Sequence, residues 1–368
     1  MKLLYITNGI NGAGGLERVL SIKASYLAEH YGYEVTIVTL NEEHPNSFYT
    51  FSSKVRLKSI TVNRNPLAYI LSYIKGIQKI IKEEIPDVIS VCDDGLKGLL
   101  FPILFGEKIP VIYERHAAMH LNFISNGEDS IIQRIKNYYM KNLMVWGAKK
   151  FASFVVLTRG NINDWPGVKC SVIPNSNPYS HAIENEIKPK SKLVLAVGSQ
   201  SYNKGYDRLF LSWKMVTAKH PEWKLKIYGK ENLALNLQDE IDKLRLQHTV
   251  YLEKPVNAIG KQYEKAAIYV MPSRSEGFGM VLIEAMSFGV PCISFDCPYG
   301  PADIIKNGED GFLIENGNSI GFAETVIELI ENEEMRKGMG SKAKKNVKRY
   351  APDKIVPIWD ELFKSLLV

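Results

Sequence analysis

The feature that most constrains the fold is an alternation of short apolar runs with longer helical patterns, which occurs twice along the 368 residues. Such continuous runs of Val, Ile and Leu are typical of parallel strands that are buried on both faces of a sheet. In the first half we predict strands at Leu3–Thr7, Glu34–Leu40, Val55–Ile60, Asp87–Val91, Val111–Glu114, Phe154–Leu157 and Ser171–Ile173. Helical patterns lie between them at Leu16–His30, Ala68–Glu84, Leu96–Phe105 and Ser130–Lys149. The alternation then restarts, with strands at Leu193–Val197, Lys224–Tyr228, Val250–Leu252, Ile268–Met271 and Cys292–Phe295.

This repetition predicts an α/β protein with two doubly wound domains, because a chain of this length is too long for one ordinary core. A polar stretch with few apolar residues, His181–Lys192, separates the halves and is typical of a linker. We therefore predict a first domain over residues 1–182 and a second over residues 183–350, with a cleft at the carboxyl ends of their strands. Residues 351–368 follow a long polar helix and contain a further amphipathic segment, Ile355–Leu367.

Composition excludes several classes of protein. No apolar run reaches about 18 residues, and the N-terminus becomes polar too soon for a signal peptide, so we expect a cytoplasmic protein. The cysteines form no C-x-x-C pair and have no histidines at zinc spacing, which indicates reduced thiols. The net charge of +6 is not accompanied by a nucleic-acid-binding motif, so we expect no nucleic-acid partner.

Two glutamates eight positions apart, Glu276 and Glu284, constrain function most tightly. They lie in S-R-S-E-G-F-G-M-V-L-I-E-A-M-S-F-G-V-P-C-I-S-F-D, where a strand is followed by a glycine-rich turn and by a helix that opens near Gly279. A helix N-terminus has unpaired N–H groups and the positive end of the helix dipole, which favour phosphate oxygens. Carboxylates on either side can accept hydrogen bonds from hydroxyl groups. This arrangement matches the ribose, diphosphate and hexose of a nucleotide-sugar.

This run resembles the signature of the retaining GT-B glycosyltransferases of family GT4, in which seven residues separate two glutamates. The resemblance implies two Rossmann-like domains that face each other, with a C-terminal helix that returns to the first domain. It also implies that Glu276 contacts the transferred sugar and Glu284 the ribose hydroxyls. The backbone expected to bind the diphosphate is that of Phe278, Gly279, Met280 and Val281.

The glycine loop N-G-I-N-G-A-G-G-L-E-R follows the first predicted strand. It is similar to the G-G-x-E-R loop of the family, which implies that Gly14 and Gly15 face the donor diphosphate and the acceptor. It also half-matches a dinucleotide fingerprint, but Glu17 stands in place of the third glycine, so an NAD oxidoreductase is a remote alternative.

His116 ends the run Y-E-R-H and should project from the carboxyl end of the fifth predicted strand. An imidazole there can hydrogen-bond a sugar hydroxyl or stabilise charge on the leaving phosphate. By the resemblance, His116 lies beside the transferred hexose, although a structural hydrogen-bonding histidine is the simpler alternative. The run V-I-P-N, which ends at Asn175, also matches the family.

The run V-G-S-Q-S-Y-N-K-G contains Lys204, which matches the family's lysine beside the donor phosphates. The family commonly has arginine where this chain has Ser199. Arg274 or Lys230 could substitute for that arginine, or Gln200 could hydrogen-bond in its place. We include Ser199 and Gly229 among the donor-binding candidates, and we take His116, Lys204 and Glu276 as the catalytic candidates.

One segment, residues 134–151, is both basic and aromatic. It carries Arg134, Lys136, Lys141, Lys149 and Lys150 together with Tyr138, Tyr139, Trp146 and Phe151. Such a helix can lie on an anionic membrane or meet a lipid diphosphate, and it can equally be an ordinary helix packed on the sheet.

The function that we predict is transfer of a hexosyl or N-acetylhexosaminyl unit from a UDP-sugar to a saccharide or polyprenyl-diphosphate-linked acceptor with retention. The resemblance points to synthesis of capsule, O-antigen or exopolysaccharide. We expect no cofactor and no metal, since Asp93–Asp94 is not a D-x-D arrangement. A nucleotide-sugar epimerase and a non-catalytic nucleotide-sugar-binding module remain alternatives.

Overall fold

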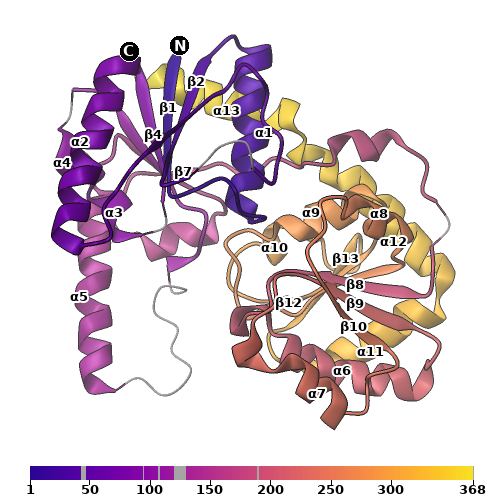
Figure 1. Ribbon diagram of the computed structural model, residues 1–368. Helices are drawn as coiled ribbons and strands as arrows, with labels where there is room; N and C mark the ends of the chain where they lie inside the picture. Colours follow the sequence, from indigo (N-terminus) through magenta and orange to yellow (C-terminus); the bar gives the residue numbers. More distant parts are fainter. Residues whose placement is uncertain (43–46, 94, 107, 120–129, 189, 368) are drawn as a thin grey trace. The chain divides into compact units, whose positions relative to one another are not determined.

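The computed structural model describes residues 1–42, 47–93, 95–106, 108–119, 130–188 and 190–367 (Figure 1). The chain forms two compact units. The first comprises Met1–Ser176 and Pro352–Val368, and the second comprises Asn177–Ala351. Each unit contains a parallel sheet covered by helices on both faces, as the alternation of patterns predicts.

The first unit has a seven-stranded sheet in the order β3-β2-β1-β4-β5-β6-β7, and all its strand pairs are parallel. The strands are β1 (Lys2–Thr7), β2 (Glu34–Leu40), β3 (Arg56–Ile60), β4 (Val88–Cys92), β5 (Val111–Glu114), β6 (Ser153–Val156) and β7 (Cys170–Val172). The helices are α1 (Gly15–His30), α2 (Pro66–Glu84), α3 (Leu96–Leu99), α4 (Phe101–Phe105), α5 (Ile131–Ala148) and α13 (Pro352–Ser365).

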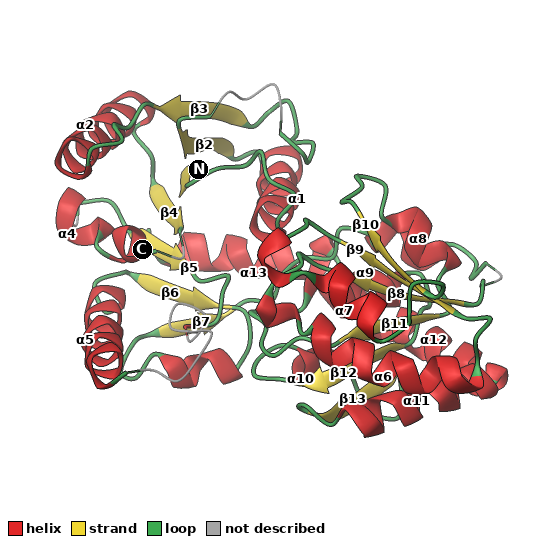
Figure 2. Ribbon diagram, turned by 60° about the horizontal axis from the view of Figure 1, so that its bottom comes forward, coloured by secondary structure: helices red, strands yellow, loops and turns green. Residues whose placement is uncertain are grey.

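Helices α2, α4 and α5 cover one face of this sheet, and α1 and α13 cover the other (Figure 2). The core under the first group joins strand residues such as Leu4 and Val91 to Tyr73 and Ile77 of α2. Helix α13 packs beside α1, so the end of the chain belongs to the first unit.

The second unit has a six-stranded parallel sheet in the order β10-β9-β8-β11-β12-β13. The strands are β8 (Leu193–Val197), β9 (Lys224–Tyr228), β10 (Val250–Glu253), β11 (Ile268–Met271), β12 (Cys292–Asp296) and β13 (Gly311–Glu315). The helices are α6 (Tyr206–Lys219), α7 (Leu237–Lys243), α8 (Gly260–Lys265), α9 (Met280–Ser287), α10 (Pro301–Ile304), α11 (Ser319–Glu331) and α12 (Glu333–Asn346).

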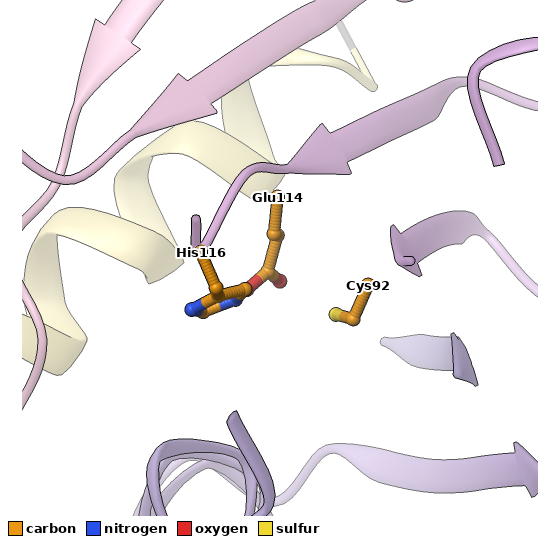
Figure 3. Close-up of side chains that lie close together, drawn as sticks. All are labelled: Cys92, Glu114 and His116. Atoms are coloured by element: carbon orange, nitrogen blue, oxygen red, sulfur yellow. The ribbon is translucent and has the colours of Figure 1, made fainter. Parts of the chain in front are cut away.

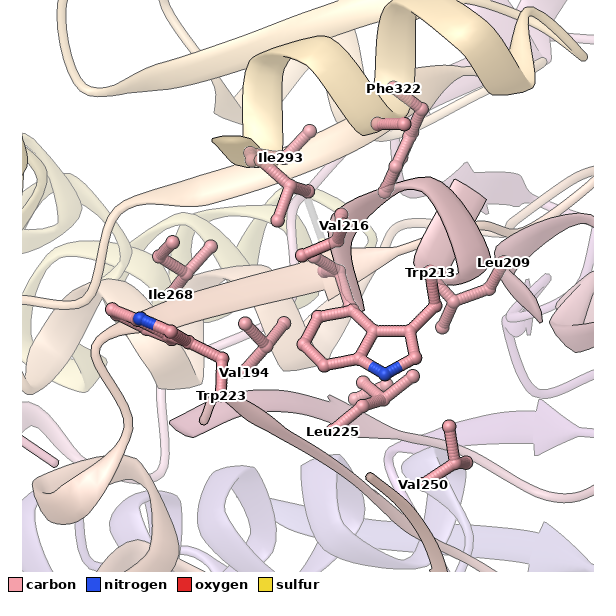
Figure 4. Packing of buried hydrophobic residues seen from close by; sticks show 14 of the residues in the cluster. Val194, Leu209, Trp213, Val216, Trp223, Leu225, Val250, Ile268, Ile293 and Phe322 are labelled. Carbon is pink, nitrogen blue, oxygen red and sulfur yellow. The ribbon is translucent and has the colours of Figure 1, made fainter. Parts of the chain in front are cut away.

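A large buried cluster of the second unit lies between its sheet and helices α6, α7 and α11 (Figure 4). Trp213 of α6 is almost completely buried there near Leu225 and Val250, and its indole N–H donates to Thr249 Oγ1 at 3.2 Å. That hydrogen bond satisfies the one polar group that the indole brings into the core. The opposite face of the sheet carries α8 and α9, and this places the turn before α9 at the carboxyl end of β11.

The polar stretch predicted as a linker belongs to the second unit. Lys190 donates hydrogen bonds to the carbonyls of Tyr263 and Glu264, near the end of α8, and to the carbonyl of Phe288, directly after α9. The Asn177 amide nitrogen already donates to Ser287 Oγ at 2.6 Å, so the boundary between the units falls a few residues earlier than position 182. Polar contacts of Lys188 and Lys190 anchor this part of the chain to the second unit. Across the part of the chain described here, no helix combines the length and the apolarity needed to cross a bilayer.

Candidate active site

The predicted site residues divide between the two units. The first unit contains Gly14, Gly15, His116 and Asn175. The second contains Ser199, Lys204, Gly229, Glu276, Phe278, Gly279, Met280, Val281 and Glu284.

In the second unit, α9 begins directly after Gly279, whose φ of 94° lies in the left-handed region that favours glycine. Met280 and Val281 are the first two residues of the helix, where amide groups have no acceptor within the helix. The turn is held in place from outside: Gly300 packs so closely that a Cβ there would lie 1.9 Å from the Phe278 carbonyl oxygen. The Glu276 amide also donates to the Pro298 carbonyl at 3.2 Å. The start of the helix is therefore a fixed group of N–H donors.

Lys204 and Glu276 contact each other beside this turn. The Lys204 ammonium lies 2.7 Å from Glu276 Oε1, and Ser273 Oγ donates to the same oxygen at 2.5 Å. Lys204 follows β8 through a short turn, and Gly205 at the end of that turn has a φ of 66° and packs on the Pro272 carbonyl. The structure thus brings together two residues that are 72 positions apart and that sequence analysis assigned to one site.

Ser199 and Gly229 also lie next to each other, at the carboxyl ends of β8 and β9. The Gly198 amide donates to the Tyr228 carbonyl at 2.9 Å, and a Cβ on Gly229 would lie 1.8 Å from the Gly198 carbonyl oxygen. Only glycine at position 229 permits this approach, which fixes the course of the backbone through Ser199.

Arg274, one possible substitute for the missing arginine, is paired with an acidic residue of its own unit. Its guanidinium makes two hydrogen bonds to Asp207, at 2.8 and 2.6 Å, and stacks over the Tyr202 ring with its central carbon 3.8 Å from the ring centroid. A bidentate pair with a carboxylate uses the fork that would otherwise bind phosphate. Arg274 instead holds the turn that carries Lys204, because its guanidinium also donates to the Tyr202 carbonyl.

Glu284 lies on α9 and is almost completely buried, with Tyr263 Oη donating to its Oε2 at 2.9 Å. Glu276 precedes the start of α9 and Glu284 lies within the helix; Tyr263 donates to Glu284, and Lys204 contacts Glu276. Asn177 supports the same helix through its hydrogen bond to Ser287.

In the first unit, His116 follows β5 and its Nε2 lies 3.2 Å from Glu114 Oε2 (Figure 3). Glu114 is fully buried and pairs with Lys23 of α1. Burial by itself would raise the pKa of Glu114, but the Lys23 ammonium and the hydrogen bond with His116 outweigh that effect and lower it to about 2. The carboxylate is therefore ionised at neutral pH.

The glycine loop precedes α1, with Gly14 at its N-cap and Gly15 at its first position. A Cβ on Gly14 would lie 2.4 Å from Glu17 Oε2, whereas Gly15 has open space around it. Burial and the nearby Glu42 carboxylate raise the pKa of Glu17. A hydrogen bond with its own backbone and the electrostatic effect of His116 lower this pKa, but they do not cancel the increase. Asn175 follows β7 and its side chain is buried. It is the residue before Ser176, where the first of the two chain segments of this unit ends.

Cys92, Glu114 and His116 form the single group in the described residues whose side-chain atoms are close enough to share a metal ion (Figure 3). These residues do not fit that role. Lys23 already supplies a positive charge to Glu114, and burial raises the pKa of the Cys92 thiol well above its usual range, which disfavours the thiolate that a metal needs. Asp94, which with Asp93 does not form a D-x-D arrangement, lies outside the described residues.

Sequence analysis missed several residues that hold the site in place. Ser273 stands three positions before Glu276, in the same conspicuous run, and its hydroxyl could have been considered. Lys23 interrupts the apolar stripe of α1 formed by Val19, Ala24 and Leu27, which is a recognisable signal of a buried charge. Tyr263 gave no such signal, because its contact with Glu284 depends on how α8 packs against α9.

The sequence matches two family models, "Glycosyltransferase Family 4" over residues 13–175 and "Glycosyl transferases group 1" over residues 180–346. The chain belongs to glycosyltransferase family 4. It is 29% identical over 375 residues to the amylovoran biosynthesis glycosyltransferase AmsD of Erwinia amylovora, covering 98% of this chain and 99% of that protein. It is 27% identical to the poly(ribitol-phosphate) alpha-N-acetylglucosaminyltransferase of Staphylococcus aureus, covering 82% of this chain and 59% of that protein.

Among solved structures, a TarM variant of S. aureus in complex with fondaparinux, alpha-GlcNAc-glycerol and UDP matches with a TM-score of 0.81. It is 17% identical and the match covers 98% of this chain and 99% of the other. This likeness shows the fold, which confirms the predicted GT-B class. The family-4 enzyme described here is thus a glycosyltransferase with two parallel-sheet units.

Proposed function

We propose that this glycosyltransferase moves a hexosyl or N-acetylhexosaminyl unit from a UDP-sugar to a saccharide or lipid-linked saccharide acceptor, with retention at the anomeric carbon. The observation that carries the proposal is the Lys204–Glu276 pair beside the start of α9, with Glu284 eight positions further on. This places a cation, a group of N–H donors and two carboxylates in one unit, as a diphosphate between two polyhydroxyl groups requires.

The chemistry follows from where charge develops. When the bond between the sugar and the diphosphate breaks, negative charge grows on the leaving phosphate. Lys204 and the amides at the start of α9 would stabilise that charge more strongly in the transition state than in the ground state. Glu276 would hold the sugar hydroxyls, Glu284 the ribose hydroxyls, and His116 of the first unit the transferred hexose.

Retention is proposed with a front-face route, in which the departing phosphate oxygen helps to take the acceptor proton. Glu276 is engaged by both Lys204 and Ser273, which suits a hydrogen-bonding role better than that of a covalent nucleophile. The name of the S. aureus relative, an alpha-N-acetylglucosaminyltransferase, supports an α-linked product.

A divalent ion is not part of the proposal, because the helix end and Lys204 supply positive charge to the diphosphate. Full loss of turnover in EDTA, restored only by a divalent ion, would contradict this point.

The relatives support a role in synthesis of a surface polysaccharide such as capsule, O-antigen or exopolysaccharide. We also propose that α5 rests on the anionic cytoplasmic face of the membrane, near lipid-linked acceptors. Only Met144, Val145, Gly147 and Ala148 of this helix are buried. Large side chains exposed along it include Ile131, Ile132, Ile135, Tyr138 and Tyr139. Three cations and no acid accompany them between residues 131 and 148. Apolar contact and cationic charge together are what an anionic lipid surface attracts.

The test is incubation with UDP-glucose, UDP-galactose, UDP-GlcNAc or UDP-GalNAc and a polyprenyl-diphosphate sugar acceptor, followed by NMR of the product. We expect transfer with the anomeric configuration of the donor preserved. An inverted product refutes retention, an isomerised UDP-sugar without an acceptor indicates an epimerase, and tight UDP-sugar binding without any product indicates a binding module.

A further inference from the structure

Helix α1 carries a lysine inside its apolar stripe. The Lys23 side chain is 1% exposed and that of Glu114, its partner, is 2% exposed, so neither charge reaches solvent. Desolvation of two charges costs several kcal/mol per ion, and a buried pair is often no more stable than apolar residues of the same size. The other buried residues of α1 are uncharged, so packing alone does not account for a charged pair at this position.

The pair is one part of a connected set of contacts on the α1 and α13 face of the sheet. Ser90 Oγ on β4 donates to Glu114 Oε1 at 2.6 Å, while Lys23 and His116 both contact Oε2. Each oxygen of the carboxylate is thus held by a donor, which fixes the plane of the group.

The C-terminal helix covers this set from outside. The Lys23 ammonium lies 3.7 Å from the centroid of the Trp359 ring of α13 and 5.0 Å from that of Tyr5. Two aromatic faces stabilise the ammonium where water cannot reach it. Helix α13 therefore completes the environment of Glu114 although it is the last element of the chain.

We propose that Glu114, paired with Lys23 beneath the Trp359 ring, is a positioning residue that fixes the orientation and the tautomer of the His116 imidazole. The proposal deepens the proposed function, on which it rests for the assignment of His116 to the transferred sugar. An ionised carboxylate can only accept hydrogen bonds, so the proton of the imidazole must lie on Nε2, the nitrogen 3.2 Å from Glu114. Without Lys23, the buried Glu114 carboxyl would favour its neutral form, which can also donate a hydrogen bond, and it would no longer select the tautomer of His116.

The experiment compares Glu114→Gln with the double variant Lys23→Met/Glu114→Gln. In the single variant the Lys23 charge is left buried without its partner, so we expect a lowered melting temperature. We also expect kcat to fall by at least about tenfold, as it does when a group that orients a catalytic imidazole is lost. The double variant removes both charges. We expect its melting temperature to return towards that of the wild type while kcat stays low, because a glutamine amide can donate or accept and no longer selects a tautomer.

The second readout is the nitrogen NMR spectrum of protein labelled with 15N-histidine, in which a His116→Asn variant assigns the His116 signals. We expect the wild-type ring to be the Nε2–H tautomer and the double variant to show both tautomers. This measurement needs no substrate, so it tests the positioning role even if the transfer reaction is not the one proposed.

Tyr33→Phe is the matched control, since it removes another buried contact of α13, the 2.6 Å hydrogen bond from Tyr33 Oη to Asp360 Oδ1. It should lower the melting temperature and leave kcat and the His116 spectrum unchanged. Recovery of wild-type kcat in the double variant, or an unchanged His116 tautomer in it, would overturn the proposal and leave Lys23–Glu114 with a purely structural role.

Discussion

Lys204 is the residue on which the donor chemistry most depends, because its ammonium is the one cation that the described part of the second unit brings into contact with Glu276. Its side chain is 22% exposed, so a ligand could reach it, and without Lys204 the Glu276 carboxylate would keep its hydrogen bond from Ser273. Binding and catalysis, more than stability, should therefore respond to its loss.

We predict that Lys204→Ala lowers kcat with the preferred UDP-sugar by about 10²- to 10³-fold, the usual effect of removing one group that stabilises a developing anion. The melting temperature should stay close to that of the wild type. Lys226→Ala is the control, since Lys226 pairs with Glu253 at 3.5 Å in the same unit and should have no kinetic effect. A kcat within twofold of the wild type in Lys204→Ala would remove this residue from the mechanism.

Glu114 makes the stability of the first unit depend on pH in the acid range. Its pKa is lowered from 4.5 to about 2 on folding, so the native state binds fewer protons than the unfolded state between those values. The stabilisation, about 3 kcal/mol, is complete above pH 4.5 and is lost as the pH falls towards 2.

The measurement is urea unfolding at pH 5 and at pH 3 of the wild type and of Lys23→Met/Glu114→Gln. We expect the wild type to lose more free energy of unfolding than the variant over that interval. Equal losses in the two proteins would mean that Glu114 has an ordinary pKa in the native state.

At this scale the sequence contains visible motifs for the candidate functional residues and gives fewer signals for the residues that hold them in place. The spacing of Glu276 and Glu284 and the position of Lys204 are visible as motifs. The pairing of Arg274, one possible substitute for the missing arginine, with Asp207 was not predicted. That pairing depends on how two loops meet, which local patterns do not encode.

Among the elements, the two loops at the ends of β8 and β9 are the most tightly packed part of the candidate donor site. Gly229 lies against the Gly198 carbonyl, and backbone cannot yield there as a flexible side chain could. The loop that contains Gly198 and Ser199 therefore has little freedom to move away from a Cβ added at position 229.

We predict that Gly229→Ala destabilises the protein by about 1–3 kcal/mol through overpacking and weakens UDP-sugar binding. Gly338→Ala is the matched control, because that glycine lies within α12 with nothing within 4 Å of a Cβ. It should stabilise the protein by about 0.5–1 kcal/mol. Unfolding by urea and titration with UDP test both variants, and unchanged stability in Gly229→Ala would contradict the packing argument.

Helix α5 gives a prediction about membranes. Replacing Ile132 and Tyr139, both exposed on this helix, with serine should reduce binding to vesicles that contain phosphatidylglycerol by removing buried apolar area. Leu233→Ser, at an exposed apolar residue of the second unit, is the control and should bind as the wild type does. Cosedimentation measures the bound fraction. Equal binding of all three proteins, or binding that is unaffected by the lipid charge, would contradict a role for α5.

Most elements follow from local patterns, and the exceptions have physical reasons. The predicted helix Leu96–Phe105 is two short helices, α3 and α4, because Pro102 cannot donate a hydrogen bond in a helix interior and instead occupies the start of α4. Strand β13 was missed because it is an edge strand with only three large apolar residues, between a glycine and a polar turn. The strand forms through its parallel pairing with β12, although its own sequence has only a weak strand pattern.

For the whole molecule, the repeated alternation of strands and helices was sufficient to predict two doubly wound units, and the resemblance of the Glu276–Glu284 run to family GT4 added the GT-B class. The family match then identifies a glycosyltransferase. The exact point at which the chain passes from one unit to the other was not predictable, because it depends on long-range contacts such as that between Asn177 and Ser287. The return of α13 to the first unit similarly rests on packing against α1, which an amphipathic pattern alone does not specify.

The central claim is that backbone amides at the start of α9 bind the diphosphate of a nucleotide-sugar between Glu276 and Glu284. A crystal structure with a bound UDP-sugar tests it most directly. We predict phosphate oxygens about 3 Å from the amides of Met280 and Val281, with the Lys204 ammonium beside them and ribose hydroxyls on Glu284. A diphosphate bound elsewhere in the protein, with both carboxylates free of the ligand, would contradict the account.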